Sequence, residues 1–157
     1  MTTEQLTVDR ISDTEIVMTR VVDAPRELVW ACHTQEEHLR RWWGRGNPLD
    51  VEIDFRVGGR YRYVEHADDG NSYAFRGEFL EIEAPHRLVQ TFEFEGMPGH
   101  VATDSLVLTE EDGRTVLTTT SRFTSKEDLD GMVASGMSDG AQRSYLALDA
   151  LLRELTA

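Results

Sequence analysis

The chain has 157 residues, a length typical of one domain that buries a core without disulfides or structural metals. Its formal net charge of −13 argues against nucleic acid as a partner, because nucleic-acid-binding faces need Lys and Arg to displace phosphate counterions. Hydrophobic residues make up 39% of the sequence, which is too many for a disordered chain.

The amino-terminal stretch, residues 1–15, is polar and acidic, and no segment is apolar enough for a signal peptide or a membrane span. We therefore expect one cytoplasmic domain over residues 1–157, with neither a membrane nor nucleic acid as a partner. The single cysteine, Cys32, excludes an intrachain disulfide and a multi-thiolate zinc site, and we expect it to be a small core residue.

The first part of the chain predicts a strand followed by two short helices. Residues 14–22 are rich in β-branched side chains, which favour a strand. The next segment, DAPRELVWA, predicts a short helix with Pro25 in its first turn. Thr34 and Glu37 have the spacing of a capping box, which predicts a second short helix that ends near Trp43.

Six further segments predict the strands of an antiparallel meander. Most of them alternate between apolar and polar residues, and short turn-forming stretches such as GG, DDGN, GMPG and EEDG separate them. The predicted strands are VEIDF (51–55), RYRYV (60–64), YAFRGEFLEIE (73–83), HRLVQTFEFE (86–95), HVATDSLVLT (100–109) and TVLTTTSRF (115–123).

The end of the chain changes to a helical period. Apolar residues recur at steps of three and four over residues 125–155, which predicts one amphipathic helix roughly 46 Å long. Thr124 and Glu127 offer a capping box at its start. The order of elements predicts an α+β fold in which this helix covers only part of the concave face of a twisted sheet, so that a cavity forms between them.

Glycines and methionines concentrate in the first half of the predicted helix. Gly136 and Gly140 lie four residues apart and so share a face with Met132 and Met137 close to it, and we expect this face to look toward the sheet. Two explanations remain open for the glycines. They allow close contact with the sheet, or they thin the helix and leave room for a ligand beside adaptable methionines.

Six segments carry a family resemblance along the chain. DAPRELVW, HLRRWWG, FRVGGRYRY, FRGEFLEI with the following AP and RLV, FEGMPGH and DGMVASGMSDG occur in this order from about residue 15 to the carboxyl end. They resemble the SRPBCC (START-like) superfamily and, within it, the activators of the heat-shock chaperone ATPase. The resemblance implies a helix-grip fold, with a curved antiparallel sheet wrapped around a long carboxy-terminal helix. The superfamily includes apolar-ligand binders, polyketide cyclases, self-sacrificing resistance proteins and co-chaperones, so it leaves the function open.

Several apparent chemical motifs are better explained as structure. His33 and His38 stand five residues apart, about 140° around a helix, unlike the metal-binding H-E-x-x-H spacing. The glycines at 58 and 59 lie between two strands and therefore form a turn, not a phosphate loop. Cys32 and His33 diverge as chain neighbours on a helix and form no nucleophile and base pair. We expect no metal and no cofactor.

One acidic residue within the predicted strands stands out. Alternation places Ala102, Asp104, Leu106 and Leu108 on one face of their strand. If this face is the concave one, Asp104 points inward, where a carboxylate needs a partner or a ligand; if the strand end frays, Asp104 is hydrated. Alternation in the neighbouring strands adds the inward-facing candidates Tyr61, Tyr63, Phe75, Phe79, Phe92, Phe94, Leu117 and Thr119.

The adjacent tryptophans at the end of the second short helix raise a separate question. Consecutive residues on a helix point about 100° apart, so Trp42 and Trp43 cannot make the same core contact. In a helix-grip fold the short helices close one end of the groove. We therefore expect one indole to pack in the core and the other to line the cavity or its entrance, the alternative being that both are core. Trp30 is expected to be core.

These features predict a protein that holds a small, largely apolar or aromatic molecule between the sheet and the last helix, with Asp104, Tyr63 or His100 orienting its polar group. One alternative is a polyketide-cyclase-like enzyme that uses Asp104 as acid or base. Another is a co-chaperone with an exposed docking face, a weaker expectation because eukaryotic activators carry an extra amino-terminal domain that this sequence lacks. The candidate ligand-binding residues are Trp42, Trp43, Tyr61, Tyr63, Phe75, Phe92, Phe94, His100, Asp104, Met132, Gly136 and Met137.

Overall fold

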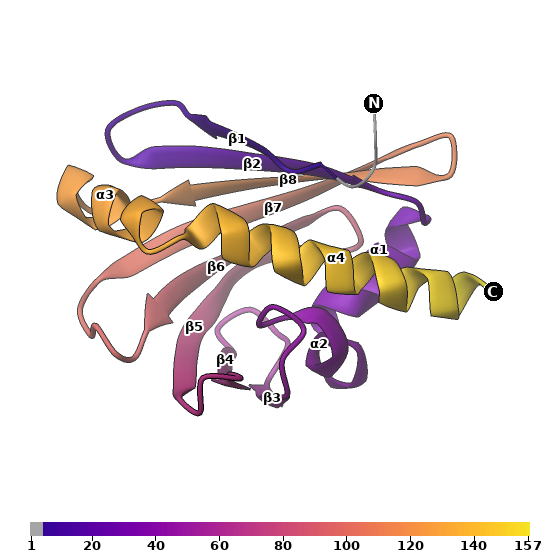
Figure 1. Cartoon of the computed structure of the whole chain (residues 1–157). Helices are drawn as coiled ribbons and strands as arrows, with labels where there is room; N and C mark the ends of the chain where they lie inside the picture. The colour runs from indigo at the N-terminus through magenta and orange to yellow at the C-terminus, as the bar shows by residue number, and fades with distance from the viewer. Residues whose placement is uncertain (1–4) are drawn as a thin grey trace.

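A computed structural model describes residues 5–157, so the first four residues of the polar amino-terminal stretch lie outside the described range. Eight antiparallel strands form one sheet in the order β1-β2-β8-β7-β6-β5-β4-β3 (Figure 1). Consecutive strands from β3 to β8 are neighbours, which confirms the predicted meander. The strands are β1 (Thr7–Arg10), β2 (Glu15–Val22), β3 (Leu49–Ile53), β4 (Arg60–His66), β5 (Ser72–Glu83), β6 (Arg87–Phe94), β7 (Val101–Glu111) and β8 (Arg114–Arg122).

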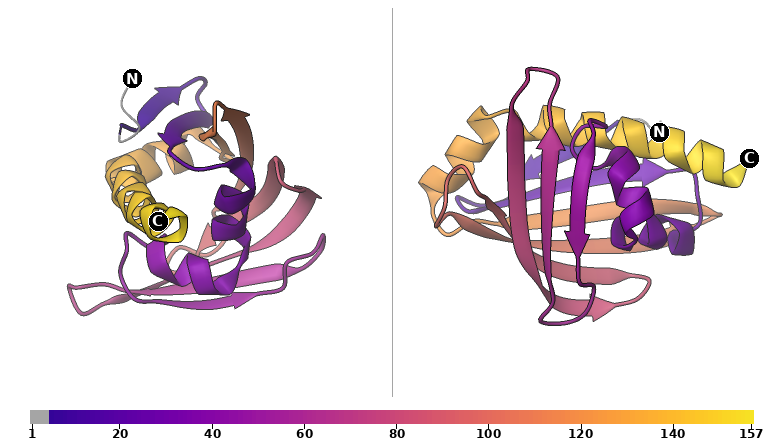
Figure 2. Two further views of the ribbon diagram at one scale, coloured as in Figure 1. Left: turned by 90° about the vertical axis from the view of Figure 1, so that its right-hand side faces the viewer. Right: turned by 90° about the horizontal axis from the view of Figure 1, so that it is seen from below.

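Four helices lie on the concave side of the sheet. Figure 2 shows β3, β4 and β5 running across the direction of β7 and β8, so that the sheet curves around the last helix. This arrangement confirms the predicted α+β fold, with two short helices after a strand and a long helix at the end. None of the helices within residues 5–157 is long and apolar enough to cross a membrane. The helices are α1 (Arg26–Thr34), α2 (Glu36–Trp42), α3 (Lys126–Ala134) and α4 (Met137–Thr156).

The first strand, β1, was not predicted from the sequence. It pairs with β2 at the edge of the sheet, from Thr7 opposite Thr19 to Arg10 opposite Ile16. All four of its side chains are exposed. A strand with no buried face has no apolar alternation to reveal it, which explains why the pattern gave no sign of this strand.

The prediction of a single helix over residues 125–155 is wrong. The helix is interrupted after Ala134, and α4 begins only at Met137. Gly136 adopts the left-handed conformation with φ of +87°, which a right-handed helix cannot contain. Gly136 is also exposed, and a Cβ atom there would meet nothing within 4 Å, so the expectation that it faces the sheet is wrong as well.

The amino-terminal helices are capped differently from the prediction. Thr34 is the last residue of α1, and its hydroxyl donates to the Trp30 carbonyl oxygen at 2.9 Å instead of forming a capping box with Glu37. Gln35 is the N-cap of α2 and makes no side-chain capping bond. Pro25 precedes α1 as its N-cap and does not lie in the first turn, where it was expected.

The predicted capping box of Thr124 and Glu127 is also wrong, by one residue. Ser125 is the N-cap of α3, and its hydroxyl accepts a hydrogen bond from the Asp128 backbone amide at 3.1 Å. The Thr124 hydroxyl donates to the Asp128 carboxylate at 2.9 Å. The helix therefore starts as predicted, but a serine with an aspartate three residues later provides the cap.

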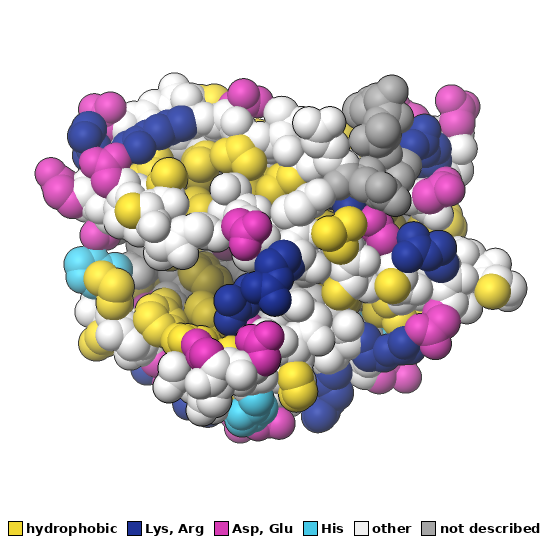
Figure 3. Space-filling model, viewed as in Figure 1, with side chains coloured by type: hydrophobic (Ala, Val, Ile, Leu, Met, Phe, Trp, Pro, Cys, Tyr) yellow, Lys and Arg dark blue, Asp and Glu magenta, His cyan; other side chains and the backbone are white. Residues whose placement is uncertain are grey.

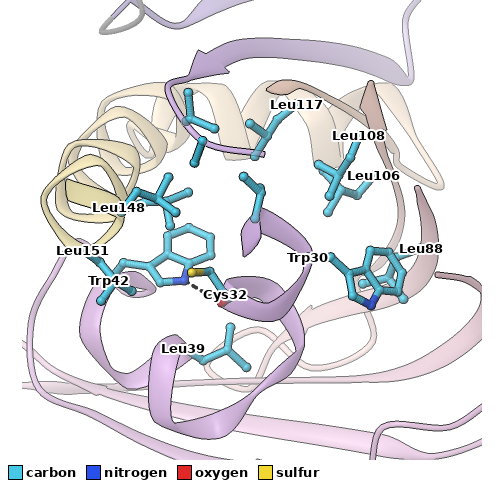
Figure 4. Close-up of a cluster of buried hydrophobic side chains, with 14 of the residues drawn as sticks. Trp30, Cys32, Leu39, Trp42, Leu88, Leu106, Leu108, Leu117, Leu148 and Leu151 are labelled. Carbon is cyan, nitrogen blue, oxygen red and sulfur yellow. Dashed lines mark hydrogen bonds between the residues drawn. The ribbon is translucent and has the colours of Figure 1, made fainter. Parts of the chain in front are cut away.

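Two separate groups of buried apolar side chains make up the interior. The larger, here called the main core, lies where α1, α2 and the second half of α4 pack on the sheet; Figure 4 shows Trp42 beside Leu148 of α4 and Cys32 of α1. Cys32 is fully buried, as predicted. The smaller group, here called the α3 cluster, consists of Ile16, Ala102, Phe123 and Leu129, with Met132 and Met137 packed against it.

Candidate functional site

A hollow opens on the concave face between the main core and the α3 cluster, and Figure 3 shows hydrophobic side chains at its floor. Phe75 faces this side because it is paired in register with buried Tyr63, and Phe92 does so because it is paired with buried Ala102. Phe94 is in turn paired with Phe75. All three phenylalanines are only partly buried and belong to neither cluster of the described chain. Inward-facing rings that remain partly exposed to solvent indicate open space between the helices and the sheet.

Five aromatic side chains form one wall of this hollow, here called the aromatic wall. The Trp43 ring centroid lies 5.0 Å from that of Tyr63 and 5.2 Å from that of Phe75, both with edge-on geometry. Phe75 stacks on Phe92 at 5.5 Å and lies 5.4 Å from Phe94. Edge-on and stacked contacts at these distances are favourable and fix the orientation of the rings. The wall therefore presents a rigid apolar surface to the hollow.

The two adjacent tryptophans are divided between the core and this wall. Trp42 is 4% exposed, and its indole N–H donates to the Cys32 carbonyl oxygen at 2.8 Å. Its ring also stacks against Tyr145 of α4, with centroids 6.0 Å apart. Trp43 is only partly buried and belongs to the aromatic wall. Trp30 is buried in the main core, as expected.

The floor of the hollow depends on close contact between a tyrosine ring and a glycine. Tyr61 is buried, and its hydroxyl donates to the Thr91 carbonyl oxygen at 2.6 Å. The ring lies directly on the backbone of Gly77: a Cβ atom there would lie 2.5 Å from the ring and 2.0 Å from the Thr91 oxygen. Burial is the main reason that the pKa of Tyr61 is well above its usual value, and the nearby charge of Asp104 raises it further.

Asp104 points into the hollow from β7, which confirms the face that alternation predicted and contradicts the alternative of a frayed strand end. It stands in register between Gln90 of β6 and Ser121 of β8. Its neighbours on the same face, Ala102 and Leu106, are buried. Asp104 is partly buried. Desolvation of its carboxyl group by the surrounding protein raises its pKa to about 6, against a smaller opposing effect of the Ser121 hydrogen bond.

The charge of Asp104 also affects the pKa of a tyrosine on α4. Burial raises the pKa of Tyr145 on α4, and the negative charge of Asp104 adds to this increase. Asp104 thus raises the pKa of one tyrosine on the sheet, Tyr61 of β4, and of one on α4, Tyr145. The hollow thus combines an aromatic wall with one ionisable group at its floor.

Arg45, in the loop after α2, connects this loop to α4 and to β4 near the aromatic wall. Arg45 donates to the buried Glu65 carboxylate at 2.8 and 2.6 Å, and Asn47 donates to the same oxygen at 2.7 Å. The Arg45 backbone amide donates to the Ser144 hydroxyl of α4 at 2.7 Å, and its guanidinium lies 6.0 Å from the Tyr73 ring. Arg45 therefore ties the loop, the helix and β4 together.

Two of the predicted site residues do not face the aromatic wall. His100 is exposed in the turn between β6 and β7, where its ring nitrogen lies 2.7 Å from the Asp128 carboxylate of α3. It precedes Asp104 by four residues, about 13 Å along a strand, so the structure does not bring the two side chains together. Gly136 lies exposed at the break between α3 and α4.

The other predicted residues lie at or near the hollow. Met132 and Met137 are partly buried against the α3 cluster, at the end of the hollow away from the main core. Tyr63 is buried within the aromatic wall, where burial raises the pKa of its hydroxyl. This hydroxyl forms no hydrogen bond with any other residue in the described range, which leaves it available to a ligand.

Cys32 and His33, which are adjacent in the sequence, have structural roles in the core. Burial raises the pKa of the Cys32 thiol to about 11 and lowers that of His33 to about 4. The His33 ring packs against Trp42 with centroids 4.7 Å apart, and its Nδ1 lies 2.8 Å from the Val29 carbonyl oxygen. Within residues 5–157, no three His, Cys, Asp or Glu side chains gather in a geometry that suits a metal ion.

Sequence reasoning missed several residues that shape the hollow. Gln90 and Ser121 flank Asp104, and the alternation that placed Asp104 identifies them once the strand register is known. Gly77 gave one signal, a glycine inside a predicted strand, which often marks a close approach of another group. Arg45 and Glu65 gave no local signal, because their pairing joins a loop to a strand twenty residues later.

Two shallow surface depressions lie outside the hollow. One of about 350 Å³ lies between the amino-terminal strand and the start of α4, and one of about 130 Å³ lies beside the turn between β7 and β8. Neither has an aromatic side chain in its lining. The hollow is therefore the better candidate for an apolar ligand.

Comparisons with known proteins agree with this architecture. The profile of the family described as "Activator of Hsp90 ATPase homolog 1-like protein" matches residues 23–153. A Rhodobacter sphaeroides protein of known structure is 27% identical with a TM-score of 0.85, over 96% of this chain and 99% of that chain. An Arthrobacter aurescens protein solved by NMR is 30% identical with a TM-score of 0.86, over 94% of this chain and 91% of that chain.

A more distant structure shares the fold alone. An HSP90 activator from Plasmodium falciparum is 24% identical with a TM-score of 0.56, and the match covers 69% of this chain and 72% of that chain. The comparison with curated proteins gave no match.

Proposed function

The chain belongs to the family of Activator of Hsp90 ATPase homolog 1-like proteins in the SRPBCC superfamily, and from this premise we propose that it binds a small, largely apolar organic molecule. The ligand would lie in the hollow between the helices α3 and α4 and the strands β5 to β7. The observation that carries this proposal is the partial exposure of Phe75, Phe92 and Phe94, which face the concave side of the sheet. Apolar rings that are partly exposed in a hollow favour the binding of an apolar ligand.

The expected affinity follows from the surface that a ligand would cover. Burial of apolar surface contributes about 25 cal/mol per Å², so covering about 150 Å² of ring surface would contribute roughly 4 kcal/mol on the protein side. The ligand gains a similar amount, and association costs several kcal/mol. About 4 kcal/mol then remains, so we expect dissociation constants in the high micromolar to millimolar range.

Tryptophan fluorescence tests this proposal directly. Titration with 4-biphenylmethanol should change the emission saturably, because Trp43 belongs to the aromatic wall and loses contact with water when the hollow is filled. Trp43→Phe should remove most of this change. Trp30→Phe is the matched control and should retain it, since Trp30 packs edge-on against Phe55 in the main core. No saturable change in the parent, or an equal change in Trp43→Phe, would contradict the proposal.

The environment of Asp104 supports a second candidate function, a polyketide-cyclase-like enzyme. A carboxyl group with a pKa of about 6 in a partly enclosed hollow can act as an acid or a base near neutral pH. Such an enzyme would convert a poly-β-keto compound in the presence of the parent protein and not of Asp104→Asn. Equal conversion by both proteins would exclude this role for Asp104.

The family description supports a co-chaperone as a further alternative. This function predicts that the protein raises the ATPase rate of an Hsp90 chaperone from the same organism, with or without a filled hollow. An unchanged ATPase rate at saturating concentrations would exclude it.

A further inference from the structure

We propose that the hollow selects an organic cation, an amine attached to an aromatic or alkyl body, whose ammonium group binds the carboxylate of Asp104. This inference rests on the proposed ligand-binding function and names the chemical class of the ligand. It follows from the pairing of the interior charges, from the free acceptor sites of Asp104 and from the position of the aromatic rings.

The basic groups near the concave face are already paired with other acids. Arg20, fully buried on β2, donates to both carboxylate oxygens of Asp149 on α4, at 3.0 and 2.6 Å. Arg45 is paired with the buried Glu65 at 2.6 and 2.8 Å. Within residues 5–157, no basic side chain forms an ion pair with Asp104. Asp104 is therefore an inward-facing carboxylate without a cation of its own.

Most of the hydrogen-bonding capacity of Asp104 is also unused. A carboxylate has about four acceptor sites, and the Ser121 hydroxyl is the side chain that bonds to this one. The nearby Tyr61 hydroxyl donates to the Thr91 carbonyl oxygen instead. A carboxylate shielded from water is costly to keep charged unless a cation or hydrogen-bond donors compensate it. An ammonium group in the hollow would supply both.

The aromatic rings lie where the rest of such a ligand would extend. Gln90, the register partner of Asp104, is two residues from Phe92 on the same face of β6, about 7 Å along the strand. Phe92 stacks on Phe75, and the row continues to Trp43. Ring faces attract cations and also accept apolar groups, so an ammonium at Asp104 with an apolar body along the wall meets complementary chemistry at both ends.

The charge of the whole protein favours the same ligand class. With a formal net charge of −13, the protein attracts cations and repels anions over the distance that screening allows. A carboxylate ligand would meet both this overall charge and the charge of Asp104. A neutral ligand would fill the apolar hollow but would gain no ion pair.

Three biphenyl compounds distinguish whether the hollow prefers a cationic, a neutral or an anionic ligand. Isothermal titration at pH 8 would compare 4-biphenylmethylamine, 4-biphenylmethanol and biphenyl-4-carboxylate, which carry a positive, a neutral and a negative polar group. We expect the amine to bind about tenfold or more tightly than the alcohol, and the carboxylate to bind most weakly, as a charge-assisted hydrogen bond implies. In Asp104→Asn the amine should lose this advantage while the alcohol binds as before, which shows that the hollow is intact. Asp50→Asn, with the same change of charge at an exposed position of β3, should preserve the preference.

Each contrary result points to a different failure. If the alcohol binds and the amine binds no more tightly, the hollow is a ligand site but the inference of an organic cation is wrong. The same conclusion follows if Asp104→Asn retains the preference for the amine. If none of the three compounds binds the parent protein, the proposed ligand-binding function fails as well.

Discussion

Trp42 and Trp43 are consecutive in the chain, yet the Trp42 indole hydrogen-bonds to the Cys32 carbonyl oxygen in the main core while Trp43 packs edge-on against Phe75 in the aromatic wall. The end of a helix causes this separation. Trp42 is the last residue of α2, and Trp43 has extended backbone angles, with φ of −66° and ψ of 150°. One short segment therefore supplies both a core anchor and part of the hollow.

The two tryptophans should respond differently to the same substitution. Trp42→Phe removes the hydrogen bond to Cys32 and leaves a small void, and we expect a loss of about 2 to 3 kcal/mol in the free energy of unfolding. Trp43→Phe keeps a ring at the partly exposed wall and should cost less than about 1 kcal/mol. Denaturant unfolding of both variants measures these losses, and equal losses would show that both indoles are core residues.

Asp104→Asn should stabilise the protein at neutral and alkaline pH. The pKa of Asp104 is about 6 in the folded protein, above the ordinary value of 3.8. Between about pH 4 and 6 the folded state therefore holds the proton more tightly than the unfolded chain, and the stability that the protonated carboxyl contributes is lost as the pH rises through this window. Asparagine resembles the protonated form, so we expect a gain of about 2 to 3 kcal/mol at pH 8 that disappears near pH 3.

The difference in stability between the parent protein and Asp104→Asn separates the effect of Asp104 from that of His33. Burial lowers the pKa of His33 to about 4, so its contribution to stability is lost as the pH falls from about 6.5 toward 4. That loss opposes the effect of Asp104 but is the same in both proteins and cancels in the difference. A gain that does not change with pH would contradict the inward, desolvated position of Asp104.

The Arg45–Glu65 ion pair should hold the loop after α2 in place. Glu65→Gln leaves the Arg45 guanidinium without its counter-ion, and because that side chain is 32% exposed, water compensates part of the loss. We expect a loss of about 1 to 2 kcal/mol in stability and faster amide hydrogen exchange at residues 44–47. Glu154→Gln breaks the exposed ion pair with Arg41 and serves as the control, with little change in either measurement. Equal effects of the two substitutions would show that the Arg45 pair has no special role.

Alanine substitutions at two glycines should have opposite effects. Gly77→Ala places a methyl group 2.5 Å from the Tyr61 ring and 2.0 Å from the Thr91 oxygen, so we expect a loss of about 2 kcal/mol or more. Gly131 lies within α3 with nothing within 4 Å of an added Cβ, and Gly131→Ala should gain about 0.5 to 1 kcal/mol from helix propensity. Thermal unfolding of both variants tests the pair, and a tolerated Gly77→Ala would mean that Tyr61 does not lie against the backbone.

The fold was predictable where local patterns report burial. Alternation and turn-forming residues located β3 to β8 because these strands each have a buried face. They did not reveal β1, whose four side chains are all exposed. The periodicity of residues 125–155 likewise concealed the break at Gly136, because apolar residues continue at steps of three and four on both sides of this left-handed residue.

The site was predictable only in part, for a related reason. Alternation alone placed Asp104 and the phenylalanines on the concave face. The partners of Asp104 depend on strand register, which brings Gln90 and Ser121 beside it from separate strands. The contact of Arg45 with Glu65 depends on the path of a loop, for which the sequence carries no periodic signal.

The presence of a ligand in the hollow is tested most directly by the methyl groups of the methionines. Met132 and Met137 lie against the α3 cluster at one end of the hollow, whereas Met97 is 58% exposed in the turn between β6 and β7. In protein labelled with ¹³C at the methionine methyls, titration with 4-biphenylmethanol should shift the NMR signals of Met132 and Met137 saturably, through ring currents, and leave that of Met97 unchanged. Saturable shifts confined to Met97, or no saturable shift at any methionine, would contradict a ligand site between the sheet and the carboxy-terminal helices.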